Sequence, residues 1–236
     1  MTQPTAVLDD VARATDRVLA TCRGLSDADL AADSLLPGWS RGHVLAHIAR
    51  NADSLVNLLT WAGTGVETPQ YVSQQVRDAD IETGAPRPVA EQIADLRASA
   101  ERFASAAVAL PSEAWDVAVR KRGGGEIRAH ALPWARLREV EIHHVDLGAG
   151  YTSADWPDDF VSRLLPELVE DFAERTDAPP VRLRCSDLDA SIGAGEPVVT
   201  VSGTAPDLAA WLIGRTDGAA LTVTPPGPMP VLPAWR

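Results

Sequence analysis

The stretch Trp134–Gly148, WARLREVEIHHVDLG, predicts a helix that carries groups able to bind a metal ion. Pro133 precedes it at a position where the first turn of a helix tolerates proline, and Gly148 stands where helices commonly end. At roughly 100° per residue, Glu139 and His143 lie about 40° apart around the helix axis and about 6 Å apart along it. A carboxylate and an imidazole therefore project from adjacent turns of one face, as two ligands of a helix-borne metal site must. The alternative for such a pair is a solvated glutamate with a histidine near a helix C-terminus.

The composition is that of an acidic globular protein. The chain has 236 residues, of which 45% are hydrophobic and 23% charged, enough to bury a sizeable core. The net charge of −12 argues against nucleic-acid and anionic-membrane binding, so an anionic substrate must be attracted by a local cation. The sequence contains no apolar run long enough for a membrane span and no apolar secretory segment near the N-terminus. We expect a cytoplasmic monomer in which Cys22 and Cys185, which match no metal or redox spacing, are buried reduced thiols.

The first part of the chain shows helical periodicity of its apolar residues. Residues 63–88 are poor in apolar residues and rich in helix breakers, which predicts a long connection able to line the mouth of a site. Residues 115–132 resemble a short hairpin with a glycine-rich tip, where Lys121 and Arg122 are expected to be solvated. Together these patterns predict an antiparallel four-helix arrangement. Its helices are expected at residues 4–23, 41–61 (capped by Ser40), 89–110 and 134–148, with a short capped turn at 26–29.

After residues 149–157 the pattern changes to that of a small mixed domain. A helix is expected at 157–174 and a second, short one at 206–213, with strands at 181–185, 198–201 and 221–223. The proline-rich tail is expected to pack as an extended segment. We therefore predict an α+β protein with two domains: a four-helix domain at 1–149 and a small α+β domain at 150–236.

The second predicted helix offers a third metal ligand. His43 and His47 share one face of it, again four residues apart. Because crossing helices of a bundle can present His and Glu side chains to one ion, the leading candidate set is His47, Glu139 and His143. Three nitrogen and oxygen ligands leave a fourth position open, which is typical of catalytic zinc. The same ligands also accept nickel or cobalt.

Other ligand sets remain possible from the residues alone. His43 could replace His47, and Glu141 with His144 could replace Glu139 with His143. Leu137, Val140 and Leu147 lie closer to Glu139, His143 and His144 than to Glu141, so we expect Glu141 on a solvated face. The sequence does not decide the side of the helix on which His144 lies.

Further charged residues on this helix admit two interpretations each. Asp146 could accept a hydrogen bond from a ligand imidazole, or it could be a carboxylate on the surface. Arg136 and Arg138 could orient a substrate carboxylate, but we expect them in solvent, as is usual for arginine on a helix. In the second domain, Arg215 follows a short helix, where a cation is favourable without any further function.

Two segments resemble a known family. SLLPGWSRGHVLAHIARNADSLVNLLTWAGTGVETPQY, at 34–71, and REVEIHHVDLGAGY, at 138–151, are similar to the mycothiol-dependent maleylpyruvate isomerase family, as is VSGTAPDLAAWLIGR at 201–215. The resemblance implies a DinB-like four-helix N-terminal domain and a smaller α+β C-terminal domain. It places the family's metal ligands on His47, Glu139 and His143, and an arginine needed for activity on Arg215. Glu141 and His144 depart from the family pattern, which has an aromatic and a small residue there.

The resemblance also implies a reaction and its cofactors. The family isomerises maleylpyruvate to fumarylpyruvate in gentisate degradation, using zinc and mycothiol. By analogy, zinc would lower the pKa of the thiol, whose addition to the cis double bond permits rotation before the thiol is expelled. Arg215 would hold a substrate carboxylate. The residues that contact mycothiol are not implied. The alternatives are a mycothiol-dependent S-transferase and a non-catalytic metal-binding module.

Overall fold

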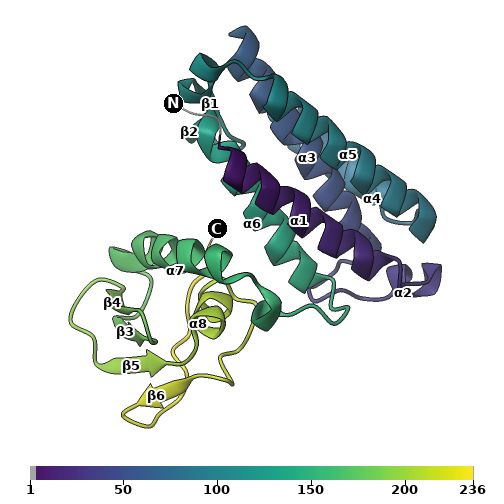
Figure 1. Ribbon diagram of the computed structural model, residues 1–236. Helices are drawn as coiled ribbons and strands as arrows, with labels where there is room; N and C mark the ends of the chain where they lie inside the picture. Colours follow the sequence, from purple (N-terminus) through teal and green to yellow (C-terminus); the bar gives the residue numbers. More distant parts are fainter. Residues whose placement is uncertain (1–3, 236) are drawn as a thin grey trace. The chain divides into compact units, whose positions relative to one another are not determined.

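The computed structural model describes residues 4–235, which divide into two compact units, with the boundary in the chain between Tyr151 and Thr152 (Figure 1). The first unit is helical and the second contains a sheet, so the predicted α+β class is confirmed. Among the residues described, no helix is both long and apolar enough to cross a membrane. Cys22 is buried and Cys185 half-buried, and both are free thiols. Burial raises the pKa of the Cys22 thiol to about 12, which keeps it protonated and inert.

The first unit is a bundle of four long helices, in which α3 and α1 each pack against both α5 and α6 (Figure 1). The predicted helices are confirmed, with ends that shift by a few residues. The long helices are α1 (Thr5–Cys22), α3 (Arg41–Thr64), α5 (Val89–Ala109) and α6 (Leu132–Asp146). Shorter elements are α2 (Asp27–Ala31), α4 (Gln74–Gly84), the 3₁₀ turns Ser112–Asp116 and Ala129–Ala131, and the hairpin β1 (Ala118–Arg120) with β2 (Glu126–Arg128).

The ends of α3 and α6 follow the chemistry expected from the sequence. The Ser40 hydroxyl accepts a hydrogen bond from the backbone N–H of His43 and so caps α3. Pro133 lies in the first turn of α6, where its missing N–H costs nothing. Gly148 follows α6 with a φ of +60°, a conformation that strains any residue with a Cβ. These signals determine where the two helices that carry the candidate ligands begin and end.

The segment at 63–88 differs from the prediction, because it contains the helix α4. Its sequence offers little apolar periodicity, and only Ile81 and Gly84 of α4 are buried. The helix is held by close backbone approach instead: a Cβ on Gly42 would lie 2.1 Å from the carbonyl oxygen of Ala85. In addition, the buried Gln92 amide donates to the carbonyl of Gly84 at 2.8 Å. Glycines at this contact therefore let α4 pack against α3.

The second unit is a four-stranded sheet with two helices, in the strand order β4-β3-β5-β6. Strands β3 and β5 are parallel, while β4 and β6 pair antiparallel to their neighbours. Helix α7 packs against α8 and β4. The elements are the 3₁₀ turn Ser153–Asp155, α7 (Asp158–Ala173), β3 (Val181–Arg184), β4 (Asp189–Ile192), β5 (Val199–Ser202), α8 (Ala205–Leu212) and β6 (Thr222–Thr224).

Two features of this unit bear on the sequence interpretation. Strand β4 was not predicted, because its sequence DASI places a single fully buried apolar side chain, Ile192, in the core. The tail after β6 is extended, as expected, and hydrogen bonds join it to α7 and to the residues that follow α7. Arg175 donates to the carbonyl of Ala234 at 2.8 Å, and the Trp235 indole donates to Asp171 at 2.7 Å.

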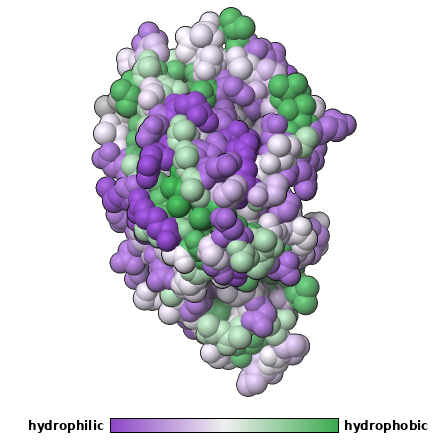
Figure 2. Space-filling model, turned by 90° about the vertical axis from the view of Figure 1, so that its right-hand side faces the viewer, coloured by the Kyte–Doolittle hydropathy of each residue, from purple (hydrophilic) through white to green (hydrophobic). Residues whose placement is uncertain are grey.

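One face of the molecule is mostly polar. Figure 2 shows a face on which hydrophilic side chains predominate and hydrophobic ones form small separate groups. Scattered apolar residues of this kind are normal on the surface of a globular protein.

Candidate metal centre

Helices α3 and α6 bring His47, Glu139 and His143 together. Nε2 of His47 lies 3.1 Å from Oε2 of Glu139 and 3.0 Å from Nε2 of His143. Nε2 of His143 lies 3.4 Å from the same Glu139 oxygen. Among the residues described, these three are the group of His, Cys, Asp and Glu side chains whose ligand atoms converge in this way. The structure thus assembles the leading candidate set.

The surroundings of the cluster close it on one side and leave it open on another. The side chain of His47 is 8% exposed and that of His143 is 15% exposed, whereas Glu139 keeps 36% of its side chain in solvent. The rings of His47 and His143 meet edge to face with centroids 4.5 Å apart, and the Trp39 ring lies 5.6 Å from His47. A small molecule would therefore approach from the side of Glu139.

Burial and mutual hydrogen bonding give the three groups different charges. Burial, reinforced by the charge of His143, lowers the pKa of His47 to about 4. Burial also acts to lower the pKa of His143, but hydrogen bonds with Asp146 and Glu139 outweigh it and raise that pKa to about 9. The two histidines likewise outweigh burial at Glu139 and hold its pKa well below the usual range. At neutral pH the cluster contains a neutral His47, a charged His143 and an ionised Glu139.

The spacing of the three ligand atoms fits a tetrahedral metal ion. Tetrahedral ligands about 2.0–2.1 Å from zinc lie about 3.3 Å from one another. The three separations between His47, Glu139 and His143 are 3.0, 3.1 and 3.4 Å, close to the edges of such a tetrahedron. An ion at this position would replace the His143 proton and leave one coordination position open.

Asp146 holds one ligand in position. Its carboxylate lies 2.8 Å from Nδ1 of His143, on the ring nitrogen opposite the cluster, and the residue is 1% exposed. A carboxylate in this place accepts the Nδ1 proton and directs the Nε2 lone pair towards a metal. The alternative of a surface carboxylate is therefore wrong. His43 takes no part, because its ring contacts the Ser40 cap and Glu82.

Models of two protein domains match the chain along nearly its whole length. The model of the mycothiol maleylpyruvate isomerase N-terminal domain matches residues 11–148, and that of the MDMPI C-terminal domain matches residues 155–234. The chain belongs to the mycothiol maleylpyruvate isomerase family. The resemblance seen in the sequence, and the DinB-like four-helix domain it implies, are confirmed.

Solved structures agree with this family assignment. The chain is similar to the crystal structure of the mycothiol-dependent maleylpyruvate isomerase, with 29% identity, a TM-score of 0.90 and all of both chains covered. It is equally similar to a histidine-to-alanine mutant of that enzyme, with 29% identity, a TM-score of 0.89 and the same coverage. A comparison with curated proteins found no match.

Glu141 and His144 lie on another side of α6 and form a closed polar cluster. Glu141 is 1% exposed, forms an ion pair with Arg17 of α1 and accepts a 2.6 Å hydrogen bond from the Tyr151 hydroxyl. His144 hydrogen-bonds Thr21 at 2.8 Å and stacks on the Tyr151 ring at 3.7 Å. The expectation that Glu141 lies on a solvated face is wrong, because α1 packs on this side of the helix.

The two arginines of α6, Arg136 and Arg138, differ in their contacts. Arg136 is buried and donates to the carbonyl of Ile48 at 2.7 Å and to the Asn51 side chain at 2.8 Å, so it joins α6 to α3. Burial lowers its pKa to about 10. The expectation that it is solvated is wrong. The guanidinium of Arg138 lies 5.8 Å from the ring of Trp134.

One residue at the cluster was not singled out from the sequence. Arg77 of α4 places Nη2 3.2 Å from Nδ1 of His47. Its only signal was its place in the segment at 63–88, which was expected to line the mouth of a site. Because the helical nature of that segment was missed, the sequence did not indicate which of its side chains face inward.

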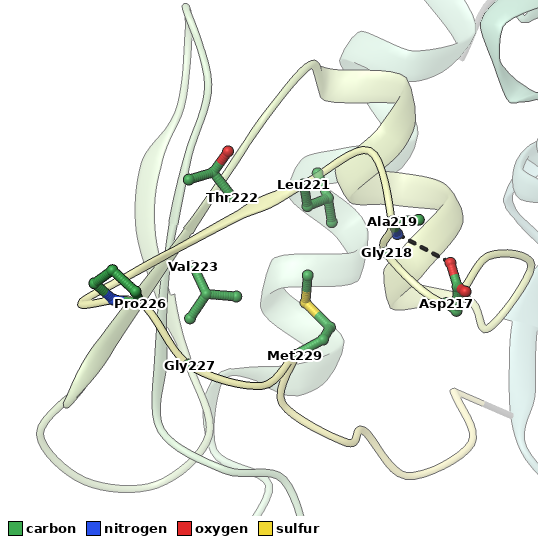
Figure 3. Close-up of a pocket in the computed structure, with 9 residues that line it drawn as sticks. All are labelled: Asp217, Gly218, Ala219, Leu221, Thr222, Val223, Pro226, Gly227 and Met229. Carbon is green, nitrogen blue, oxygen red and sulfur yellow. Dashed lines mark hydrogen bonds between the residues drawn. The ribbon is translucent and has the colours of Figure 1, made fainter.

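Arg215 lies in the second unit, in the turn that follows α8. It is half-buried, its backbone N–H donates to the carbonyl of Ala210 at 2.8 Å, and Nη1 donates to that of Ile213 at 2.9 Å. A groove of about 430 Å³ in this unit, shown in Figure 3, is lined by residues of 217–229 and does not include Arg215. Asp217 is the one ionisable group among its lining residues, and it accepts from the backbone N–H of Ala219.

Proposed function

We propose that this member of the family is a mycothiol-dependent maleylpyruvate isomerase that converts maleylpyruvate to fumarylpyruvate, a step of gentisate degradation. The observation that carries the proposal is the cluster of His47, Glu139 and His143, spaced for a tetrahedral ion, within the region matched by the family's N-terminal domain. The similarity of the chain, over its full length, to a solved enzyme of this activity further supports the proposal. The partners would be small molecules, namely the substrate and mycothiol.

In this chemistry the protein would hold the metal ion and orient its ligands. A zinc ion bound here would supply Lewis acidity that lowers the pKa of the mycothiol thiol, whose thiolate can add reversibly to the cis double bond. His47 and His143 would hold the ion through Nε2, and Glu139 through a carboxylate oxygen. Asp146 would keep the proton of His143 on Nδ1, away from the ion. The exposed side of Glu139 would admit the reactants.

Arg215 is proposed to bind a substrate carboxylate. A guanidinium can bind a carboxylate through two parallel hydrogen bonds, which fixes the orientation of the substrate. It would also provide a local positive charge in a protein of net charge −12. We expect Arg215→Ala to lose activity while it binds metal as the wild type does, with Arg215→Lys retaining more activity than alanine. Unchanged turnover in Arg215→Ala would remove this residue from the proposal.

The deciding experiment is an assay of the purified, zinc-loaded protein on maleylpyruvate, with and without mycothiol, that follows fumarylpyruvate and free thiol. An isomerase forms product only with mycothiol present and returns the thiol unchanged. Consumption of thiol in proportion to turnover would instead indicate an S-transferase. Stoichiometric metal without turnover of either kind would contradict the isomerase and favour a non-catalytic metal-binding module.

Two histidines of α3 provide a matched pair of variants for this assay. His47→Ala removes a proposed ligand, whereas His43→Ala removes a histidine one turn away that contacts Ser40 and Glu82. We expect the first variant to lose metal and activity and the second to retain both. Equal activity of the two variants would show that the cluster does not carry the reaction.

A further inference from the structure

Arg136 of α6 is a buried cation that is only partly hydrogen-bonded. The residue is 1% exposed, and Nη1 donates to the carbonyl of Ile48 and to the side-chain oxygen of Asn51. Nε and Nη2 are also buried, and neither has a hydrogen-bond partner among the residues described. Buried polar groups in proteins are nearly always hydrogen-bonded, so these two nitrogens call for an explanation.

The two nitrogens without a partner belong to one edge of the guanidinium. The N–H groups of Nε and Nη2 point in the same direction, and a carboxylate can accept two parallel hydrogen bonds from such an edge. Nη1 lies on the other side of the group and is held by α3, which fixes the direction of the free edge. The side chain is therefore already arranged to bind a planar anion through two hydrogen bonds.

The carboxylates nearest to Arg136 are engaged with other groups. Burial lowers the pKa of Arg136 to about 10, and the neighbouring Glu139, Tyr71 and Asp53 offset this effect only in part. Glu139 faces the two histidines of the metal cluster, and Asp53 pairs with one arginine of α3 and one of α5. Neither carboxylate hydrogen-bonds to Arg136, whose charge is thus left without a bonded counter-ion.

Arg17 shows that this bundle can supply a counter-ion to an arginine. The side chain of Arg17 is 34% exposed, and it pairs with Glu141 where α1 packs on α6. Arg136 is far more buried, yet it contacts only neutral oxygens. Because an uncompensated buried charge lowers the stability of a fold, a contribution to stability does not account for this cation.

The free edge belongs to the part of the bundle that holds the candidate metal centre. Arg136 precedes Glu139 by three residues, about one turn of α6. Tyr71, which also influences Arg136, is half-buried in the segment 65–73, which joins α3 to α4 without helix or strand. A small carboxylate would reach the guanidinium from the exposed side of Glu139 when Tyr71 moves aside.

We propose that Arg136 binds a carboxylate of the substrate through Nε and Nη2, beside the metal position. This role is additional to the one proposed for Arg215. The substrate class, a small dicarboxylate such as maleylpyruvate, rests on the proposed function. The binding of a carboxylate rests only on the buried guanidinium and its unpaired edge. The bound carboxylate supplies the counter-ion that the fold does not.

The test compares two substitutions of Arg136. Arg136→Met removes the donors and the charge, whereas Arg136→Lys keeps the charge but lacks an edge with two parallel donors. Arg13→Met and Arg13→Lys are the matched controls, since they make the same changes at an exposed arginine paired with Asp10. Isothermal titration measures the affinity of each full-length protein for maleate, both saturated with zinc and after treatment with a chelator. Thermal unfolding without maleate shows that each variant folds.

Both Arg136 variants are expected to bind maleate more weakly than the wild type. Arg136→Met should lose about 10- to 100-fold, the range of a charge-assisted hydrogen bond. Arg136→Lys should lose less, because its ammonium still attracts the anion, and it carries the test if the methionine variant does not fold. The losses should appear with and without zinc, since Arg136 is not a metal ligand. The Arg13 variants should match the wild type.

Three results would overturn this proposal. They are failure of the wild type to bind maleate, maleate affinity that is unchanged in folded Arg136 variants, or an equal loss in the Arg13 variants, which would assign the effect to net charge. A residue that only joined α6 to α3 would lower the unfolding temperature when replaced and leave the maleate affinity unchanged.

The isomerase activity is judged separately, by turnover of maleylpyruvate in the wild type. Maleate binding that depends on Arg136, in a protein that turns nothing over, would support the binding role and contradict only the proposed reaction. Normal turnover with unchanged maleate affinity in the Arg136 variants would support the reaction and contradict the role of Arg136.

Discussion

Helix α6 carries two pairs of glutamate and histidine on different sides, and the two pairs differ in exposure and in the helix that they face. Glu139 and His143 face His47 of α3, and the glutamate remains 36% exposed. Glu141 and His144 are each 1% exposed and face α1. The same residue types, one or two positions apart on one helix, thus form an open cluster of candidate ligands and a closed polar core.

The partner across the helix interface makes the difference. Glu139 meets the neutral imidazole of His47, which can offer a nitrogen lone pair to a metal. Glu141 meets Arg17, which stays protonated at any physiological pH and satisfies the carboxylate permanently. Burial and Glu141 also raise the pKa of Tyr151, so its hydroxyl stays protonated and donates to the same carboxylate. In this helix the metal site therefore depends on a neighbour that can offer a lone pair, in addition to ligands at the right spacing.

Replacing the glutamate on each side of α6 should have the largest and most different effects. Glu139→Ala should lose metal affinity by more than the 10- to 100-fold typical of the residues that orient ligands, because it removes a ligand itself. Isomerase activity should fall with it. Glu141→Gln should keep full metal stoichiometry, measured after dialysis against a limited concentration of chelator. Equal metal loss in the two variants would show that the two sides of α6 are not distinct in function.

The role of Asp146 gives a smaller effect at the same site. Asp146→Asn keeps the shape of the side chain but weakens the hydrogen bond that orients His143. Zinc affinity should fall about 10- to 100-fold, as is usual when a carboxylate behind a ligand histidine is lost. Competition with a chromophoric chelator measures it. An affinity equal to that of the wild type would mean that α6 alone positions His143.

The pKa of His143 predicts how metal binding depends on pH. In the metal-free protein this pKa is raised to about 9, so the ring is charged at pH 7 and must lose a proton to become a ligand. Zinc affinity should therefore rise about tenfold per pH unit from pH 7 until it levels off near pH 9. Calorimetry in buffers of different ionisation enthalpy should show release of about one proton at pH 7. An affinity independent of pH between 7 and 8 would contradict a charged His143.

The part of this site that could be predicted from the sequence is the part that depends on local geometry. The spacing of Glu139 and His143, the Ser40 cap and Gly148 each act within a few residues, so the helices and the ligand pair followed from them. The third ligand, His47, followed from the single further assumption that the two helices cross.

What the sequence could not predict depends on contacts between distant segments. Arg17 and Glu141 are 124 residues apart, and nothing local to either indicates that they meet. Helix α4 depends on the close approach of Gly42 to Ala85, so its own apolar pattern is weak. Burial of a charged group is decided by its partner, which explains why Glu141 was assigned to solvent and why Arg77 was not singled out.

The smallest expected effect concerns the stability of the closed side. Glu141→Gln leaves Arg17 without its charged partner, and we expect a loss of about 1–3 kcal/mol in the free energy of unfolding, measured with urea. The loss should stay below the roughly 3–5 kcal/mol of a fully buried broken pair, because the side chain of Arg17 is 34% exposed and can be hydrated.

A double variant tests whether the ion pair itself is the cause. If it is, adding Arg17→Met to Glu141→Gln should restore part of the lost stability, because no buried charge is then left unpaired. Additive losses in the double variant would place the effect in the hydrogen bond from Tyr151 instead. In either case the metal affinity should not change, since α1 and α3 contact different sides of α6. A change in metal affinity would mean that Glu141 and His144 help to position Glu139 and His143.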